Sequence, residues 1–338
     1  MITVFDDAQR AHDPQFFLSS GARMPCPEQP RRIEALLSAV RQLGGPVESP
    51  KDRGLDPIRA VHPDRYLTFL RTIYDRWQRI EGASPEVIAN IHPANRTDGY
   101  PRSAVGQAGF HQTDTSCPIA RETWGAAYAS AQTALHAAHL VLGGERSAYA
   151  LCRPPGHHAF AELAGGFCYL NNSAIAAEAL TRSGRKVAIL DVDLHHGNGT
   201  QGIFYARGDV LTVSIHAHPE RYYPFFWGYP DETGEGDGLG ANLNLCLARG
   251  TGDAGFLSAL ATALDRIARF GADTLVLALG LDAYEGDPFA GLAVTTAGFG
   301  RIGQMIRAVD LPTLIVQEGG YLCPELGLNL QAVLGAWA

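Results

Sequence analysis

Short runs of β-branched and aliphatic residues recur along the chain and alternate with alanine-rich segments of helical composition. The runs are Ile2–Phe5, Ala148–Cys152, Val187–Leu190, Val210–Ile215, Leu275–Leu279 and Thr313–Val316, and the helical segments are Thr123–Leu142, Ala174–Thr181, Phe256–Phe270 and Phe299–Val309. Continuous apolar strands are typical of a parallel sheet that is covered on both faces. The alternation therefore predicts an α/β fold: a three-layer αβα arrangement around a doubly wound, mainly parallel sheet.

No low-complexity linker or charge block divides the 338 residues, of which 46% are hydrophobic. We therefore expect one domain that spans residues 1–338. Long stretches with little regular pattern lie near residues 12–30, 92–118 and 216–240, and the last two are rich in Gly, Pro and aromatic residues. Long loops in a compact domain usually shape a binding site, so these three are the expected active-site loops.

Composition argues against several classes of protein. The formal net charge is −8 and no basic stripe is present, which argues against nucleic acid as a partner. No stretch has eighteen uninterrupted apolar residues, and the first residues do not form a signal-peptide pattern, so neither a membrane span nor secretion is expected. The six cysteines are scattered, without the paired spacings of a thiolate zinc site, and indicate reduced thiols in a cytoplasmic protein.

The stretch from Ile189 to Gly199 leads an apolar strand directly into two carboxylates, imidazoles and glycine. Side chains alternate along a strand, so Asp191, Asp193 and His195 are expected on one side of its end, where open α/β sheets bind ligands. Two carboxylates buried beside an imidazole lose hydration and repel each other unless a cation compensates them. The stretch therefore predicts a divalent metal.

Three further segments place polar residues just after expected strands. They are Cys152 to His158, with two prolines and a glycine before tandem histidines; Leu279 to Asp282, with one carboxylate; and Gln317 to Tyr321, with two glycines before a tyrosine. Each segment alone also fits a helix cap, a turn or an ordinary loop. Together with the Asp/His stretch, all at strand ends, they predict one shared crevice.

These motifs resemble the histone deacetylase superfamily of zinc amidohydrolases, which has an arginase-like α/β fold, and within it the bacterial acetylpolyamine amidohydrolases. The resemblance runs from Glu28 in the Glu-Gln-Pro-Arg-Arg segment to Tyr321. Its most specific parts are Arg153-Pro-Pro-Gly-His-His158, Gly165-Gly-Phe-Cys-Tyr-Leu-Asn-Asn172 and Asp191-Val-Asp-Leu-His-His-Gly-Asn-Gly199.

The resemblance implies that Asp193, His195 and Asp282 bind one Zn²⁺ per chain and leave a position open for water or substrate, as catalytic zinc sites do. This oxygen-rich set also suits ferrous iron or cobalt, so the metal's identity rests on the family. Zinc would polarise the acyl carbonyl and lower the pKa of its water. Tyr321 would donate to the developing oxyanion.

The tandem histidines are expected to differ in role. By resemblance, Asp191 backs His157, which favours the imidazolium, and Asn198 backs His158, which orients the ring without raising its pKa. His158 is therefore assigned as general base and then general acid, and His157 as an electrostatic partner. In relatives, the Asp191 position and a serine that matches Ser214 also hold K⁺; Ser214 equally fits an ordinary buried hydroxyl.

The resemblance also indicates a tunnel for an acylated amine. Phe167 and Tyr223 match its aromatic walls, Gly166 lies beside Phe167, and Asp114 matches a rim carboxylate that binds substrate nitrogen. Many relatives have phenylalanine where this chain has Tyr223. Aromatic residues are also common core fillers, and that alternative stays open for both.

The function predicted by the resemblance is the zinc-dependent removal of acetyl groups from small cationic acetylated amines, such as acetylcadaverine or acetylputrescine. The alternatives are an acyl-lysine deacylase that acts on proteins or peptides, and a non-catalytic acyl-amine binding protein. A homodimer is also expected, through the irregular segment from Phe16 to Pro27, because apolar Phe16, Phe17, Leu18 and Met24 suit a monomer surface poorly. The competing interpretation is that these residues pack on their own chain.

Overall fold

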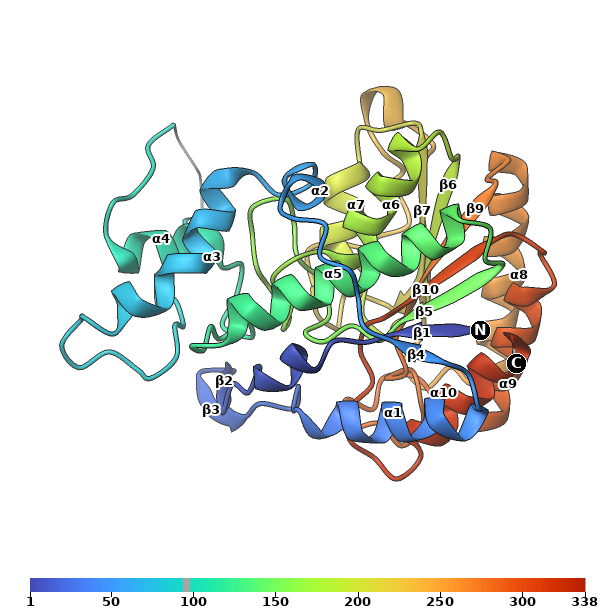
Figure 1. Cartoon of the computed structure of the whole chain (residues 1–338), viewed down its shortest axis with the longest axis horizontal. Helices are drawn as coiled ribbons and strands as arrows, with labels where there is room; N and C mark the ends of the chain where they lie inside the picture. Colours follow the sequence, from blue (N-terminus) through green and yellow to red (C-terminus); the bar gives the residue numbers. More distant parts are fainter. Residues whose placement is uncertain (94–97, 338) are drawn as a thin grey trace.

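A computed structural model, which describes residues 1–93 and 98–337, has one parallel sheet between two layers of helices (Figure 1). The order of the eight-stranded sheet is β4-β1-β5-β10-β9-β6-β7-β8, and every neighbouring pair is parallel. Its strands are β1 (Ile2–Val4), β4 (Val47–Glu48), β5 (Ser147–Ala150), β6 (Val187–Asp191), β7 (Val210–Ala217), β8 (Asn242–Leu247), β9 (Thr274–Leu279) and β10 (Thr313–Gln317). The predicted three-layer, parallel, single-domain fold is confirmed.

The helices are α1 (Arg31–Leu43), α2 (Asp56–Arg59), α3 (Asp64–Trp77), α4 (Ala104–His111), α5 (Thr123–Leu142), α6 (Asn172–Arg182), α7 (Asn198–Phe204), α8 (Asp253–Phe270), α9 (Thr296–Arg307) and α10 (Leu326–Leu334). Short 3₁₀ turns are η1 (Asp7–Ala11), η2 (Gly236–Gly238) and η3 (Gly335–Trp337). Among the described helices, none is long and apolar enough to cross a bilayer.

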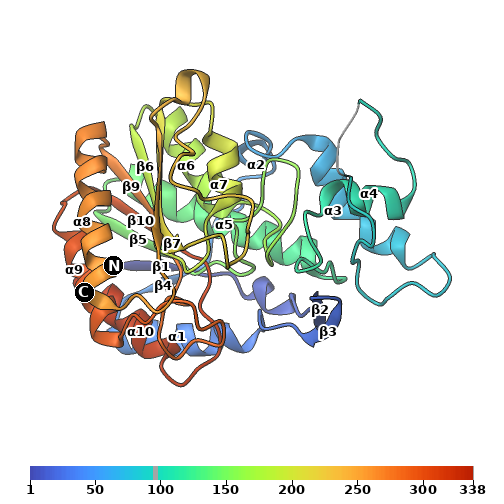
Figure 2. The same ribbon diagram turned by 180° about the vertical axis from the view of Figure 1, so that it is seen from behind.

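Strand side chains alternate between two hydrophobic cores. In β10, Leu314 and Val316 pack with residues of α5 and α6, whereas Ile315 between them packs with residues of α1, α8, α9 and α10. The two views show these helix groups on opposite faces of the sheet (Figures 1 and 2). Burial on both faces explains why the central strands read as continuous apolar runs.

Both edge strands were missed by the sequence analysis. β4 has only two residues, and β8 alternates asparagine with apolar residues. The side-chain amides of Asn242 and Asn244 both donate to Gln201 Oε1, at 2.9 Å each, so one face of β8 is buried in a polar network. A half-polar edge strand does not give the apolar pattern used to find the others.

The three expected loops contain more regular structure than their sequences indicate. Residues Phe16–Ser19 (β2) and Ala22–Pro25 (β3) form an antiparallel hairpin instead of an irregular segment. Its two turn residues, Ser20 and Gly21, have φ values of 50° and 78°, which is typical of a tight hairpin turn. Helix α4 lies within the stretch 92–118, of which residues 94–97 are outside the described part of the chain, and the stretch 216–240 begins inside β7.

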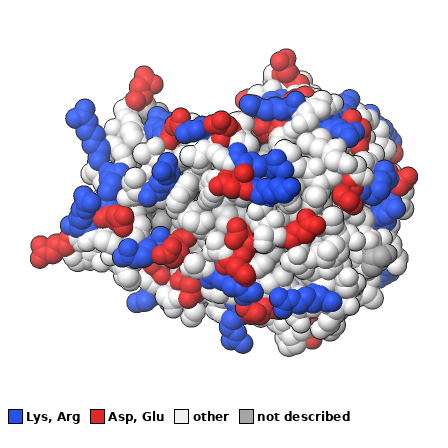
Figure 3. Space-filling view, in the orientation of Figure 1, with Lys and Arg blue, Asp and Glu red and all other residues white. Residues whose placement is uncertain are grey.

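The hairpin, α3 and α4 lie at one end of the molecule, and both termini lie toward the other (Figure 1). On the face seen in Figure 3, Lys and Arg side chains are interspersed with Asp and Glu side chains. No continuous cationic stripe is visible on that face.

Candidate active site

Four neighbouring strands carry the predicted site. β5, β10, β9 and β6 are adjacent in the sheet, and the segments with chemical groups follow their carboxyl ends. Parallel strands end at the same edge, so residues more than 160 positions apart in sequence are brought together there: the backbone N–H of Gly156 is 2.7 Å from Glu318 Oε2. The predicted convergence of the four segments is observed.

Asp193, His195 and Asp282 form a buried cluster whose ligand atoms lie within 4.8 Å of one another. His195 Nδ1 is 3.1 Å from Asp282 Oδ2 and 3.3 Å from Asp193 Oδ1. The strand ends at Asp191, and each aspartate then accepts a hydrogen bond from the backbone N–H two residues later. Asp191 lies outside the cluster. The expected row of Asp191, Asp193 and His195 is therefore not observed, and Asp193 and His195 cluster with Asp282 instead.

The cluster carries more negative charge than its own imidazole balances. Burial opposes the charge on His195, but hydrogen bonds to Asp193 and Asp282 raise its pKa to about 10. Burial raises the pKa of Asp282, and the neighbouring Asp193 raises it further. Among the described residues, only histidines form ion pairs with either carboxylate.

The donor set fits a divalent metal. Two carboxylate oxygens and one ring nitrogen converge, and backbone N–H groups hold the other oxygens: Leu194 donates to Asp282 Oδ1 and Gly319 to Asp193 Oδ2. A Cβ at Gly280 would lie 2.1 Å from Asp193 Oδ2, so glycine is required for this close approach. A cation would relieve the repulsion between the two carboxylates.

The tandem histidines differ in their hydrogen-bond partners and in the direction in which their pKa values shift. His157 Nδ1 is 2.9 Å from Asp191 Oδ2, and although burial opposes its charge, Asp191 and Asp193 raise its pKa to about 10. His158 Nδ1 is 2.7 Å from Asn198 Oδ1, and burial followed by the charge of His157 lowers its pKa well below the usual value. A donating Nδ1 leaves His158 Nε2 unprotonated and able to accept a proton.

Asp191 and Ser214 are register partners on β6 and β7. Both line a small cavity of about 10 Å³ that is separate from the main pocket. The Asp191 carboxylate contacts His157 Nδ1 and accepts from the backbone N–H of Asp193, and Ser214 Oγ is 2.8 Å from His216 Nδ1. The two residues predicted to hold K⁺ are therefore adjacent, and their role stays a prediction.

A pocket of about 440 Å³ opens onto the cluster. His158, His195 and Tyr321 line it, whereas His157 does not. The hairpin tip contributes Phe17 to Ser20, so the mouth contains part of the early segment even in one chain. The pocket is thus shared by His158, by Tyr321 and by His195, the one member of the metal-binding cluster that lines it.

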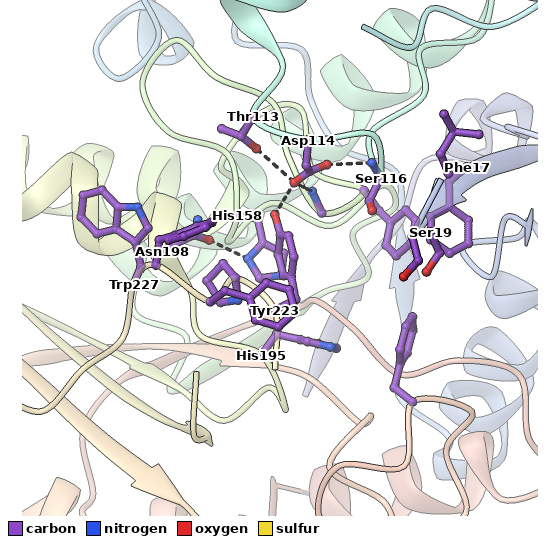
Figure 4. Close-up of a pocket in the computed structure, with 18 of the residues that line it drawn as sticks. Phe17, Ser19, Thr113, Asp114, Ser116, His158, His195, Asn198, Tyr223 and Trp227 are labelled. Carbon is purple, nitrogen blue, oxygen red and sulfur yellow. Dashed lines mark hydrogen bonds between the residues drawn. The ribbon is translucent and has the colours of Figure 1, made fainter. Parts of the chain in front are cut away.

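Phe167, Gly166, Tyr223 and Asp114 line the pocket. Tyr223 and Asp114 lie next to each other beside His158 (Figure 4). Phe167 is 7% exposed and adopts a φ of 65°, and its ring lies 5.5 Å from that of Phe17. The Tyr223 ring packs edge-on against His158, with centroids 4.8 Å apart. The Tyr223 hydroxyl donates to Asp114 Oδ2 at 2.6 Å.

Asp114 is half-buried and held by neutral donors alone. Besides Tyr223, the backbone N–H groups of Ser116 and Gly166 donate to it at 2.7 and 3.2 Å, and the Thr113 hydroxyl donates at 3.1 Å. No ion pair to Asp114 occurs among the described residues. Its carboxylate therefore lines the pocket without a counterion from residues 1–93 or 98–337.

Several supporting residues were missed by the sequence analysis. Asp287 accepts from the backbone N–H of Tyr321 at 2.9 Å, and Phe289 packs against both His195 and Tyr321, with ring centroids 5.3 and 4.7 Å away. Arg32 Nε donates to Gly320 O at 2.6 Å. The Asp-Pro turn at Asp287 was the one sequence signal for the first of these.

Comparison with known proteins identifies the family. A histone deacetylase domain model matches residues 26–337. An acetylpolyamine amidohydrolase from Burkholderia pseudomallei is 48% identical over 100% of this chain and 98% of its own, and one from Mycoplana ramosa is 42% identical over 99% and 98%. The crystal structure of an acetylpolyamine aminohydrolase from Burkholderia pseudomallei matches with a TM-score of 0.96, at 48% identity, over 100% of this chain and 98% of that one. With the buried metal-binding set and the paired histidines described above, these matches show that the chain belongs to the histone deacetylase family of hydrolases.

Proposed function

We propose that this protein hydrolyses the amide bond of acetylated aliphatic amines, with acetylpolyamines such as acetylcadaverine and acetylputrescine as substrates. The observation that carries the choice of substrate is the Asp114 carboxylate, which has no counterion among the described residues and lines the pocket that leads to the metal-binding cluster. A protonated amine at the far end of a short methylene chain supplies the missing positive charge. The names of the full-length relatives support the same substrate class.

Asp193, His195 and Asp282 would hold one zinc ion, since zinc dependence is the norm in this family. Zinc supplies a Lewis acid for the acyl carbonyl and lowers the pKa of water to near neutrality. His158 Nε2 accepts the proton of the attacking water and then gives it to the leaving amine nitrogen. Its Nδ1 stays bonded to Asn198, which fixes the ring during both transfers.

Tyr321 donates its hydroxyl to the carbonyl oxygen as negative charge develops there. Asp287 holds the tyrosine's backbone, and the edge-on ring of Phe289 restricts its position. His157, paired with Asp191, contributes positive charge beside His158 without entering the pocket. Phe167 and Tyr223 confine the methylene chain, and Gly166 gives the wall its close approach, because a Cβ there would lie 2.4 Å from His158 Cδ2.

We further propose K⁺ at the Asp191 and Ser214 cavity, a homodimer through the hairpin, and a cytoplasmic location. All six cysteines are free, which suits a reducing compartment. For the dimer, Phe16 is 7% exposed and packs on its own chain, as the competing interpretation held, whereas Met24 is 45% exposed. The proposed dimer contact therefore depends on Met24 and on the exposed edge of the β2–β3 hairpin.

Melting temperature tests the proposed K⁺ site. We expect the melting temperature to rise more in KCl than in LiCl.

Zinc-reconstituted protein assayed on acetylputrescine, acetylcadaverine, an acetyl-lysine peptide and neutral N-butylacetamide tests the function. We expect the acetylated diamines to have the highest kcat/KM. A higher kcat/KM for the peptide would identify an acyl-lysine deacylase. Turnover of none of them, with zinc fully bound, would leave the non-catalytic binding protein as the explanation.

A further inference from the structure

Glu318 is a fully buried carboxylate to which the proposed mechanism gives no task. It follows β10, three residues before Tyr321, and its side chain is 0% exposed. Its own backbone is fixed on both sides: its N–H donates to Leu279 O at 2.9 Å, and Arg32 Nη2 donates to its carbonyl oxygen at 2.7 Å. Burial raises the pKa of the Glu318 carboxyl to about 7, and a carboxyl group this deep in a protein requires a specific reason, because its desolvation is costly.

The side chain of Glu318 contacts the turn that carries the tandem histidines. Its Oε2 accepts from the backbone N–H groups of Gly156 and His157, at 2.7 and 3.1 Å. Its Oε1 accepts from the hydroxyl of Ser173, in the first turn of α6, at 2.8 Å. One carboxylate thus connects the end of β10, the turn that presents both histidines, and the start of a helix.

The turn that carries the histidines is closely packed, so it cannot adjust freely if the Glu318 side chain moves. A Cβ at Gly156 would lie 2.4 Å from the backbone nitrogen of Asn172, so the turn is already pressed against α6. The rings of His157 and His158 are in contact, with centroids 3.9 Å apart and planes tilted by 41° to each other. A shift of the His157 backbone therefore moves His158, the residue that lines the pocket, with it.

A second metal site does not explain Glu318. His157, Cys168 and Glu318 do place ligand atoms within 4.8 Å of one another. However, both Glu318 oxygens already accept hydrogen bonds from protein donors, and burial raises the pKa of the Cys168 thiol well above its usual value. A neutral thiol and an engaged carboxylate make a poor ligand set.

We infer that Glu318 is a positioning residue for the proposed hydrolysis: its carboxylate geometry holds the Gly156–His157 backbone so that His158 Nε2 stays in register with the substrate. This inference rests on the proposed function. On this inference, kcat depends on how far the acceptor oxygens of residue 318 extend and not on their negative charge. Two near-isosteric changes separate these properties, because Glu318→Gln keeps the reach without the charge and Glu318→Asp keeps the charge without the reach.

In Glu318→Gln, the amide oxygen can accept from Gly156 and His157 while the NH₂ group donates to the Ser173 oxygen. We expect kcat within about 3-fold of wild type. Glu318→Asp withdraws the carboxylate by about 1.5 Å, one C–C bond. Because misplacement by about 1 Å can cost around 10²-fold, we expect kcat to fall at least about 10-fold while KM changes less than about 3-fold.

Ser173→Ala is the matched control, since it removes the Oε1 partner but leaves both turn contacts in place. It should keep kcat near wild type, and all variants should keep one zinc per chain by elemental analysis. Three results would overturn the inference. Glu318→Gln or Ser173→Ala could lower kcat as much as Glu318→Asp does, or Glu318→Asp could lose its zinc.

If Glu318→Asp does not fold, hydrogen exchange of the Gly156 and His157 amides decides the question in wild type and Glu318→Gln. Retained protection with retained kcat supports the anchor, and lost protection with normal kcat overturns it. Wild-type protein that hydrolyses no acetylated amine would refute the proposed function itself. Active wild type with an equally active Asp variant would refute only the role of Glu318.

Discussion

The edge of the sheet formed by the carboxyl ends of its strands, called the edge below, differs in construction from the mouth of the pocket. At the edge, Asp193, Asp282 and Glu318 are completely buried, and each carboxylate accepts from a backbone N–H group that follows another strand of the sheet. At the mouth, Phe225 and Phe226 are 48% and 85% exposed, and two hydrogen bonds between Leu18 and Thr115 tie the hairpin to the loop beside it. The edge is therefore suited to chemistry that tolerates little displacement, and the mouth to selecting which amines enter.

The largest effect is expected where the edge is broken directly. His195→Ala should lose zinc and bring activity to background, because the two remaining carboxylates no longer form a closed ligand set. Elemental analysis and kcat/KM are measured together, with His139→Ala in α5 as the control. Full zinc occupancy in His195→Ala would remove this residue from the ligand set.

Next in size is the loss of the proton carrier. His158→Ala should lower kcat by about 10²–10⁴-fold, because the other histidine among the described residues of the pocket lining, His195, belongs to the metal-binding set. His157→Ala should cost less, since this ring lies outside the pocket. The two variants are compared across pH at equal zinc content, and a much greater loss for His157→Ala would reverse the division of roles.

Tyr321→Phe removes one hydroxyl and should lower kcat by about 10²–10³-fold while zinc and the melting temperature stay unchanged. Tyr128→Phe is the matched control, because its hydroxyl donates to Asp52 and neither residue lines the pocket. Steady-state kinetics on acetylputrescine give the comparison. A kcat equal to that of the control would exclude oxyanion stabilisation by Tyr321.

At the mouth, effects should depend on the substrate. Asp114→Asn keeps acceptor capacity but removes the charge, so kcat/KM for acetylputrescine should fall by roughly 5- to 10-fold, about 1 kcal/mol, and hardly change for N-butylacetamide. Glu220→Gln removes an exposed carboxylate and serves as the control. Equal losses for both substrates would exclude Asp114 from amine recognition.

The smallest effect on chemistry is expected from the proposed dimer contact. Met24→Glu should shift light scattering at micromolar concentration from dimer to monomer, with kcat on the smallest substrate within about 2-fold, because the buried edge is untouched. Leu328→Glu, on α10 and also exposed (53% against 45% for Met24), is the matched control. A monomeric wild type would exclude the dimer, and a dimeric Met24→Glu would place the interface elsewhere.

Sequence patterns predicted the central strands and the long helices, but not the hairpin or the edge strands. The central strands are buried on both sides, so their apolar runs were unmistakable, and α5 was predicted with the bounds observed. The hairpin at Phe16–Pro25 and the edge strand β8 were missed, because a short hairpin and a half-polar strand depend on what packs against them. Local pattern is most informative where burial is complete.

The sequence by itself determined the chemical groups: which carboxylates, imidazoles and tyrosine follow which strands. Their spacing could not show that Asp191 turns to His157 while Asp193 turns to Asp282, because that depends on the bends after β6. Nor could it show that Glu318 contacts a turn 162 residues earlier, or that Tyr223 reaches Asp114. The contacts at the sheet exist because parallel strands that are distant in sequence end close together, whereas the Tyr223–Asp114 contact joins two loops, and only the folded chain decides which strand ends and loops meet.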